Sequence, residues 1–379
     1  MINLLATATS TPPHAFSTTE LIASMMHKLS PELINTIGAL GVDQRFSTLE
    51  NFPEFLCGAP MRATSSSTEL GVQAARRCIE EWGGDPRRVG LLIAGTNTPA
   101  QLLPCLASEV MAEMHGVLSR SISTVSMQAQ GCSVLLKTVE VARWYLTANP
   151  GKLALILLSE AHTPYITPVR GGEYLGYREI ARLRRGSALG EREAERRRLD
   201  TTFMVQAMLF GDGAVALLLG REDGIAEFGP IAHLTNDDPG DVDLLAMGGG
   251  SLRPCAEGER PVYLMRPSVP NRGAHYAVET VRRVLEDPAS PVSGVGDVSG
   301  CLIHTGSKKI LDGVCAQLSI EPGSEKVQTS YEVLKTYGNL SSASTGFMLA
   351  DRKGRREGPA IVVGFGVGFT ASAGVVNFG

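Results

Sequence analysis

The sequence predicts an α/β protein in which parallel sheets are covered by helices and which is built from two similar halves. Short apolar runs alternate with helical stretches along the chain, as in layered α/β folds. Two turns, Gly131-Cys132 and Gly338-Asn339, each precede a similar helix, which indicates an internal duplication. A chain of 379 residues is long enough for one large duplicated unit. We expect the halves at residues 1–222 and 223–379.

In the first half, four apolar runs have the length and composition of buried strands. They cover residues 89–96, 121–127, 153–159 and 214–219. Helices are expected at about 105–116 and from 133 to about 146, the second directly after Cys132. That second helix is apolar on most faces, so we expect it to be central and buried.

The second half repeats the order. Strands are expected at 300–304, 327–331, 360–364 and 372–378, and helices at about 307–318 and 341–349. Because Gly338-Asn339 then takes the place of Gly131-Cys132, the two turns are expected at corresponding points of the two halves.

The segment 166–200 interrupts this pattern with nine arginines and six acidic residues. It separates two strands that we expect to be near neighbours. One interpretation is a solvated helical excursion with Glu/Arg pairs at helical spacing. The other is a basic lid or docking surface for an acidic carrier protein or a coenzyme phosphate.

Composition excludes several classes of protein. Hydrophobic residues make up 43% and charged residues 20%, which is typical of a globular protein. The net charge of −4 makes no case for nucleic-acid binding. No apolar stretch approaches the roughly 18 residues of a membrane span, and the N-terminus has no basic segment before its short apolar run. We therefore expect a cytoplasmic protein that binds neither membrane nor nucleic acid.

Seven cysteines are spread along the chain, an odd number without a Cys-x-x-Cys pair. This pattern argues against a disulfide framework and a structural zinc site. No metal is expected.

Cys132 is the candidate nucleophile. A cysteine at a helix start meets unpaired backbone N–H groups and the positive end of the helix dipole. Both favour the thiolate and so lower the thiol pKa from its free value of about 8.5. The alternative is a small buried core cysteine, which is the common fate of a free thiol.

His304 and Asn339 are the candidate partners of Cys132. His304 ends an expected strand, and ligands of parallel α/β sheets bind at that edge. Asn339 by itself is typical of a turn or cap. Together, an imidazole and a carboxamide can donate to one thioester carbonyl and stabilise the charge that builds there when a malonyl-type thioester loses carbon dioxide. A thiol, an imidazole and a carboxamide are the groups that a carbon–carbon bond-forming enzyme needs.

The glycine-rich segment 364–368 follows an expected buried strand. It is either a tight turn or a place where the N–H of Val367, with that of Cys132, faces an acyl-thioester oxyanion. It lacks the spacing and the following helix of a dinucleotide-binding loop. Asp212, in a turn before the strand at 214–219, is expected to be structural.

These segments together resemble the thiolase-fold condensing enzymes of the ketoacyl-ACP synthase III and type III polyketide synthase group. The resemblance is carried by QGCS around Cys132, FGDGAVALLLG at 210–220, IHTGSKKIL at 303–311, YGNLSSAS at 337–344 and GFGVGFT at 364–370. They occur in the order of that family and span most of the chain.

The resemblance implies a five-layered αβαβα fold, a homodimer and a catalytic triad of Cys132, His304 and Asn339. An acyl group from an acyl-CoA or acyl-carrier-protein thioester would load onto Cys132, and no other cofactor is implied. A second thioester, activated by decarboxylation or α-deprotonation, would then attack to give a β-keto product. By the same resemblance, the loop at Leu103-Pro104 would reach the partner's pocket across the dimer interface.

Two departures from the family pattern bear on function. The residues after Cys132 are larger than usual, and Val367 has an N–H where type III polyketide synthases have proline. We therefore expect an enzyme of polyketide or other specialised metabolism. Two alternatives stay open: an acyltransferase that moves the acyl group from Cys132 to a hydroxyl or amine, and a non-catalytic partner subunit. The acyl chain, the extender and the choice between CoA and carrier protein also stay open.

Overall fold

The computed structural model describes residues 2–168, 172–249, 255, 263–353 and 357–379. In these residues, nine strands form one sheet in the order β11-β12-β13-β8-β1-β7-β6-β4-β5. The first half contributes β1 (Ile2–Ser10), β4 (Val89–Thr96), β5 (Ser123–Gln128), β6 (Leu153–Glu160) and β7 (Gly213–Gly220). The second half contributes β8 (Ala226–Thr235), β11 (Gly300–Ile303), β12 (Gly358–Gly366) and β13 (Thr370–Phe378).

The strand pairing repeats between the two halves. In the first half β4 pairs in parallel with β6, β6 antiparallel with β7, and β7 antiparallel with β1. In the second half β11 pairs in parallel with β12, β12 antiparallel with β13, and β13 antiparallel with β8. The halves join where the start of β1 pairs with the start of β8. The repeated order agrees with an internal duplication, whereas the boundary expected at residue 222 stays a prediction.

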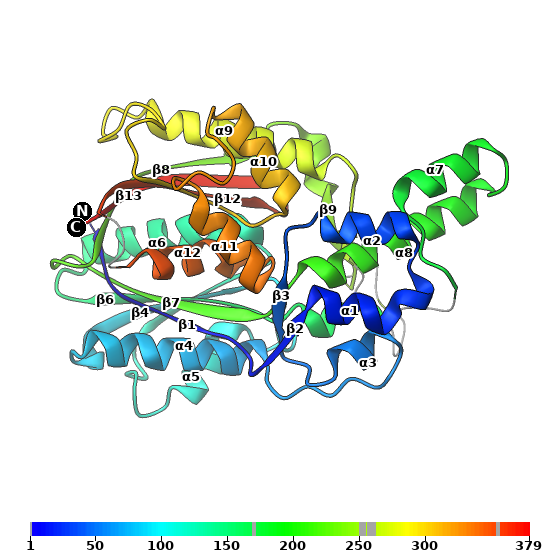
Figure 1. The fold of residues 1–379 in the computed structure, drawn as a ribbon. Helices are drawn as coiled ribbons and strands as arrows, with labels where there is room; N and C mark the ends of the chain where they lie inside the picture. The colour runs from blue at the N-terminus through cyan, green and yellow to red at the C-terminus, as the bar shows by residue number, and fades with distance from the viewer. Residues whose placement is uncertain (1, 169–171, 250–254, 256–262, 354–356) are drawn as a thin grey trace.

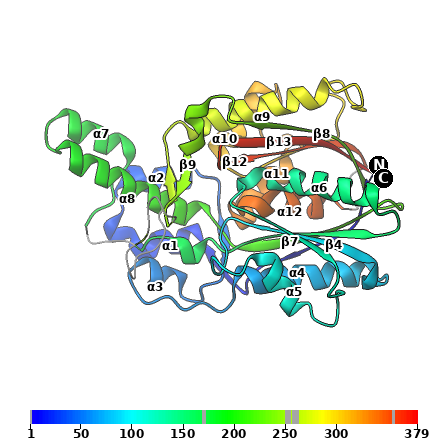
Figure 2. The same ribbon diagram turned by 180° about the vertical axis from the view of Figure 1, so that it is seen from behind.

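The structure has five layers (Figures 1 and 2). Three are layers of helices, and the strands of each half of the sheet form a layer between them. The outer layers are α4 (Ser67–Trp82) with α5 (Leu106–Glu113), and α9 (Val269–Leu285) with α10 (Lys308–Gln317). The central layer holds α6 (Val134–Ala148) and α12 (Ser344–Arg352), each of which contacts strands of both halves. Strands β4, β6 and β7 are buried along their whole length because helices cover both faces, which explains their continuous apolar sequences.

The other elements gather at one end of the layered body (Figure 1). They include α1 (Thr18–Met25), α2 (Pro31–Gly38), α3 (Phe52–Leu56), α7 (Tyr177–Arg185) and α8 (Glu191–Leu209). Two small two-stranded antiparallel sheets accompany them: β2 (His14–Ser17) with β3 (Gln44–Ser47), and β9 (Leu245–Met247) with β10 (Tyr263–Met265). The predicted excursion at 166–200 is confirmed as helical over α7 and the start of α8, although its residues 169–171 lie outside the described part.

One predicted strand is wrong. Residues 327–331 were expected to form a strand, but they open α11 (Gln328–Tyr337). Its buried residues Ser330, Val333 and Leu334 recur at three- to four-residue spacing, which gives a helix one apolar face. The second half therefore has no described counterpart of β5. Asn339 follows a helix, although a strand was expected there.

Candidate active site

Cys132 lies in a 3₁₀ turn, Gly131–Ser133, between β5 and α6. Its side chain is buried, and its Sγ lies 3.4 Å from the Oγ of Ser341. The turn places the thiol where the central helix begins, as the sequence predicted. Because the next residues are the buried start of α6, the thiol has little freedom to move.

Asn339 is held next to Cys132 by the same serine. Its Oδ1 accepts a hydrogen bond of 2.8 Å from the backbone N–H of Ser341. Only the oxygen of a carboxamide can accept from an N–H, so this contact sets the orientation of the amide and leaves its NH₂ group as the donor. The backbone N–H of Asn339 donates to the carbonyl of Leu209 at 2.8 Å, which fixes the turn against the end of α8.

His304 follows the last residue of β11 and is buried. Its backbone N–H donates to the carbonyl of Val363 at 2.9 Å, which continues the parallel pairing with β12. The ring packs edge-on against Phe365, with centroids 5.4 Å apart. Its Nδ1 is buried and has no hydrogen-bond partner among the described residues.

Strand β12 connects His304 to Cys132. The register of β11 and β12 places Ile303 beside Val363, and the next residue of β12, Gly364, packs on the backbone of Cys132. A Cβ on Gly364 would lie 2.5 Å from the carbonyl oxygen of Cys132, so a larger residue would push the two elements apart. The fold thus gathers Cys132, His304 and Asn339 at one edge of the sheet, through Ser341 on one side and β12 on the other.

Glu160 is a site residue that the sequence analysis missed. It ends β6, is fully buried, and accepts hydrogen bonds from the Oγ1 of Thr98 at 2.7 Å and the Nδ2 of Asn97 at 2.8 Å. It also accepts from the backbone N–H of Ser342 at 3.3 Å. The sequence could have indicated it, because an acidic residue directly follows the apolar run 153–159. A carboxylate at the end of a buried strand needs hydrogen-bond donors around it.

Asn97 extends this contact to the nucleophile. Its Oδ1 accepts from the backbone N–H of Gly131 at 2.9 Å, and its Nδ2 also donates to the Oγ of Ser341 at 3.0 Å. One carboxamide therefore links the Cys132 turn to both Glu160 and Ser341.

The turn that carries Val367 packs directly on the Cys132 turn. A Cβ on Gly131 would lie 2.6 Å from the backbone nitrogen of Val367, and one on Gly366 would lie 3.0 Å from the backbone nitrogen of Cys132. The two nitrogens proposed for an oxyanion hole are therefore neighbours. A hydrogen bond of 2.6 Å between the hydroxyls of Ser133 and Thr370 joins the two turns again.

Burial determines the charge state of the site. It raises the pKa of Cys132 to about 12, and the charge of Glu160 adds to this effect, while Ser341 opposes it. Burial likewise lowers the pKa of His304 to about 3. The direction is opposite to the expectation that the helix start lowers the thiol pKa, because burial removes the hydration of the thiolate. Both side chains are neutral at pH 7.

A groove of about 600 Å³ leads away from this region. It is lined by Leu209, whose carbonyl accepts from Asn339, and by Gly306 and Ser307, which follow His304. Its walls include Leu40, just after α2, and apolar residues of α8 and α9. Three cationic side chains also line it: Arg198, Arg266 and Lys309.

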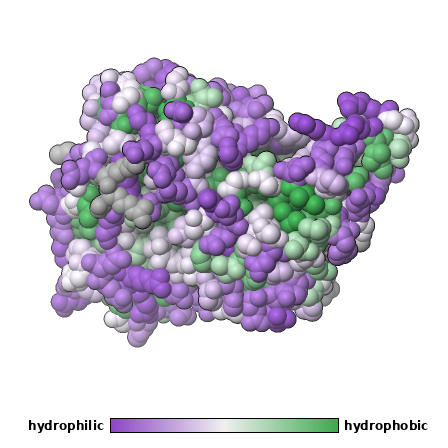
Figure 3. Space-filling view, viewed as in Figure 1, coloured by the Kyte–Doolittle hydropathy of each residue, from purple (hydrophilic) through white to green (hydrophobic). Residues whose placement is uncertain are grey.

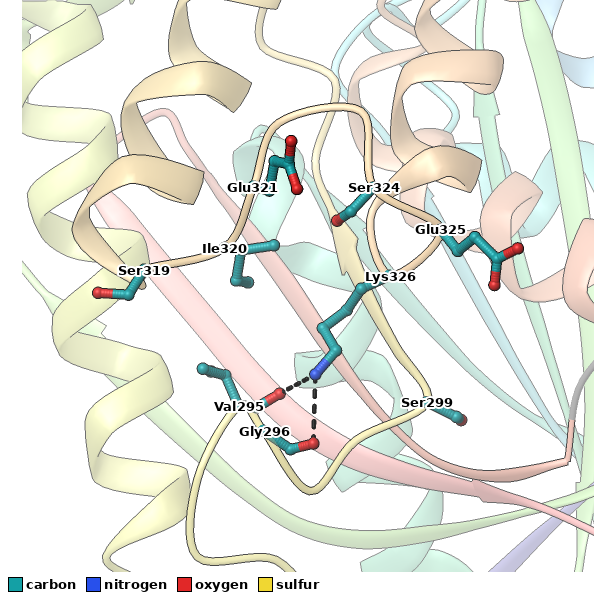
Figure 4. Close-up of a pocket in the computed structure, with 9 residues that line it drawn as sticks. All are labelled: Val295, Gly296, Ser299, Ser319, Ile320, Glu321, Ser324, Glu325 and Lys326. Carbon is teal, nitrogen blue, oxygen red and sulfur yellow. Dashed lines mark hydrogen bonds between the residues drawn. The ribbon is translucent and has the colours of Figure 1, made fainter.

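A second hollow, of about 450 Å³, is drawn in Figure 4. Ser299 lines it just before β11, so it lies at the opposite end of that strand from His304. Its Lys326 is already bonded to the carbonyls of Val295 and Gly296, at 2.5 and 3.3 Å. Parallel sheets bind ligands at the carboxyl ends of their strands, so we do not place the site here.

Within the described ranges, no three His, Cys, Asp or Glu side chains gather in a way that would hold a metal ion. No described helix is long and apolar enough to cross a bilayer. Asp212 has the structural role that was expected. It is fully buried and accepts hydrogen bonds from the backbone N–H groups of Thr48 and Thr163, at 2.7 and 2.9 Å.

Comparison with known proteins identifies the fold. Residues 293–378 match the family model of the 3-oxoacyl-[acyl-carrier-protein] synthase III C-terminal region. The C-terminal type III polyketide synthase domain of Dictyostelium 'Steely1' superposes with a TM-score of 0.76 at 18% identity, over 100% of this chain and 99% of that one. The chain has the thiolase fold of these condensing enzymes.

Other similar proteins fall in the same group. A priming β-ketosynthase of a polyketide pathway superposes on this chain with a TM-score of 0.72 at 21% identity, over 100% of this chain and 96% of that one. A β-ketoacyl-[acyl-carrier-protein] synthase III from Sphingopyxis alaskensis is 27% identical over 317 residues, 82% of this chain and 84% of that protein. Bisdemethoxycurcumin synthase from Oryza sativa subsp. japonica is 25% identical over 333 residues, 82% of this chain and 71% of that protein.

One predicted site residue lies apart from the others. Leu103 is 84% exposed in the loop between β4 and α5, beside Leu102, which is 76% exposed. This position neither confirms nor contradicts a role across a dimer interface, which stays a prediction.

The raised pKa of Cys132 has a measurable consequence. Because the thiolate fraction rises with pH up to the thiol pKa, alkylation of Cys132 by iodoacetamide should accelerate about tenfold per pH unit from about pH 6 to 9, with no plateau. Peptide mass spectrometry measures the label on the peptide that contains Cys132. The Cys132→Ser variant is the control, and the same peptide should stay unlabelled in it. A plateau near neutral pH would mean that the helix field outweighs burial.

Gly131→Ala should abolish turnover. The φ of Gly131 is +70°, and the added Cβ would lie 2.6 Å from the Val367 nitrogen, so the two turns must separate. Gly151→Ala is the matched control, since its φ is +83° and its Cβ would meet nothing within 4 Å. The control should lose only about 1–2 kcal/mol of stability and keep its activity. Melting curves and turnover measure both, and equal activity of the two variants would contradict the close packing.

Proposed function

We propose that this enzyme is a ketosynthase that loads an acyl group onto Cys132 and joins it to a second thioester by a Claisen condensation. The observation that carries the proposal is the gathering of a buried thiol, a neutral imidazole and an oriented carboxamide at one edge of the sheet. The presence of Asn339 favours condensation over simple acyl transfer.

In the loading step, the Sγ of Cys132 attacks the carbonyl carbon of an acyl thioester. The N–H groups of Cys132 and Val367 stabilise the oxyanion that forms. The C–S bond of the donor then breaks, and the departing thiol of CoA or phosphopantetheine takes up the proton that Cys132 loses. Since burial penalises separated charges, the proton should move together with bond formation.

In the condensing step, a malonyl-type thioester loses carbon dioxide, and the electron pair of the broken bond remains on the α-carbon. The resulting enolate oxygen accepts hydrogen bonds from the imidazole of His304 and the NH₂ group of Asn339. Two neutral donors suit this role because they stabilise the developing charge without prior ion pairing. The carbanion attacks the acyl carbonyl, a C–C bond forms, and Cys132 leaves as thiolate and is reprotonated.

The polyketide and fatty-acid relatives support a role in one of these two kinds of biosynthesis, and we propose specialised metabolism. The groove beside Gly306 fits the long, thin arm of CoA or phosphopantetheine, since its walls are apolar and cations line it.

We further propose that the enzyme is a homodimer. Strand β5 pairs only with β4 in the described sheet, and unpaired strand edges favour association. Its first residues, Ser123 and Thr124, are exposed, whereas β4 is buried throughout. Leu102 and Leu103 add exposed apolar surface in the loop that leaves β4.

Cys132→Ala and Asn339→Ala test the proposed chemistry together. Intact-protein mass spectrometry with a panel of acyl thioesters should show a mass gain that Cys132→Ala lacks. Asn339→Ala should still acylate, yet its condensation rate should fall about 10²- to 10³-fold because one enolate donor is lost.

A small, equal effect of Asn339→Ala on loading and turnover would favour the acyltransferase alternative. No adduct with any donor would favour a non-catalytic subunit and overturn the proposal.

The dimer is tested by replacing both exposed leucines. Sedimentation should give twice the chain mass of 40.3 kDa for the wild type. Leu102→Asp with Leu103→Asp should yield monomers, because two carboxylates would be buried unpaired at the interface. A monomeric wild type would contradict the assembly, and a dimeric double variant would place the interface elsewhere.

A further inference from the structure

A basic helical hairpin projects from the end of the molecule that carries the site. It comprises α7 and the first half of α8, and Figures 1 and 2 show it extending beyond the layered body. Between residues 177 and 199 it carries eight arginines and four glutamates, although the whole chain has a net charge of −4. Figure 3 shows strongly hydrophilic residues over the hairpin and a hydrophobic patch near its foot.

The hairpin is held firmly at its foot. The hydroxyl of Ser30 donates to Glu179 at 2.5 Å, and the backbone N–H of Arg178 donates to Glu32 at 2.8 Å. Inside the hairpin, Ile180 and Ala194 are buried against neighbouring side chains. A rigid projection of this kind can present side chains to a partner without a large ordering cost.

Ion pairs neutralise only part of the positive charge. Four arginines of the hairpin are paired with acidic side chains: Arg182, Arg184, Arg196 and Arg197. The other four form no ion pair with any side chain in the described ranges: Arg178, Arg185, Arg192 and Arg198. The predicted Glu/Arg pairs at helical spacing are therefore present, yet a net positive surface remains.

The basic surface is continuous with the groove that is lined by Gly306 and Ser307, two and three residues after His304. A hollow of about 400 Å³ lies between α7 and α8, where Arg184 and Arg185 line it. Tyr177 and Arg198 line both this hollow and the larger groove. The groove in turn reaches Gly306 and Ser307, next to His304. A groove therefore leads from the hairpin to the segment that follows His304.

We propose that the α7–α8 hairpin is the docking surface for an acidic carrier protein, whose phosphopantetheine arm enters the groove. The proposal rests on the ketosynthase function and chooses between its two thioester donors. The anionic groups of CoA lie next to its arm, where Arg198, Arg266 and Lys309 line the groove. Arg185 lines only the outer hollow, and Arg192 lines neither hollow. A partner larger than a coenzyme is needed to use these two charges.

Charge reversal at the outer end of the hairpin separates the two donors. Arg185→Glu with Arg192→Glu changes the surface beyond the groove and leaves its lining intact. The matched control is Lys152→Glu with Arg221→Glu, two exposed residues that form no ion pair with described side chains and lie outside the hairpin. The donors are one acyl group carried either by CoA or by the purified acyl carrier protein of a bacterial fatty acid synthase.

The hairpin variant should raise the KM for loading from the carrier protein about tenfold and leave the KM for acyl-CoA unchanged. The control variant should change neither. The effect on the carrier should shrink as salt is added, because the charges that it removes are exposed.

An unchanged KM for the carrier, an equal rise for both donors, or a wild type that loads from CoA alone would each overturn the docking surface. Loading of Cys132 from acyl-CoA followed by condensation would leave the ketosynthase function standing in each of these cases. If neither donor acylates Cys132, the ketosynthase function itself fails.

Discussion

The buried carboxylate of Glu160 is the constraint on which the arrangement of the site depends. A carboxylate removed from water costs several kcal/mol unless donors replace its hydration. Here the donors come from the end of β4, through Asn97 and Thr98, and from the 3₁₀ turn of the second half, through Ser342. The charge can be accommodated only if both halves bring their donors to the same place. Glu160 therefore holds the two halves in register at the edge where the chemistry takes place.

The nucleophile is positioned as a consequence. Asn97 uses one end of its carboxamide on Glu160 and Ser341 and the other on the N–H of Gly131, so the Cys132 turn is aligned with the Asn339 turn. The absence of a Cβ at Gly131 then lets the Val367 turn approach the same point. Each contact is modest by itself, but together they leave little freedom in a region that must stabilise charge on two different oxygen atoms.

The same burial that orders the site also keeps it neutral. It raises the pKa of the Cys132 thiol and lowers the pKa of the His304 imidazole for one reason, the loss of hydration of the charged form. Such a site resists ionisation until a substrate brings a group on which charge can develop. The hairpin formed by α7 and α8 differs in kind, since its charges are exposed and screened, and they are suited to the recruitment of a partner.

The sequence by itself determined the α/β class, the order of most strands and helices, and the three candidate residues. Continuous apolar runs of strand length such as 153–159 are typical of buried strands, and a Gly-Cys turn before an apolar helix indicates a thiol at a helix start. The sequence did not determine whether residues 327–331 form a strand or a helix, since a short run with few apolar residues fits the apolar spacing of either element. Only the tertiary structure decided that residues 97, 160 and 341 surround Cys132, and that burial raises the thiol pKa. Hydration and long-range hydrogen bonds depend on which residues meet in space, and spacing along one chain carries no such information.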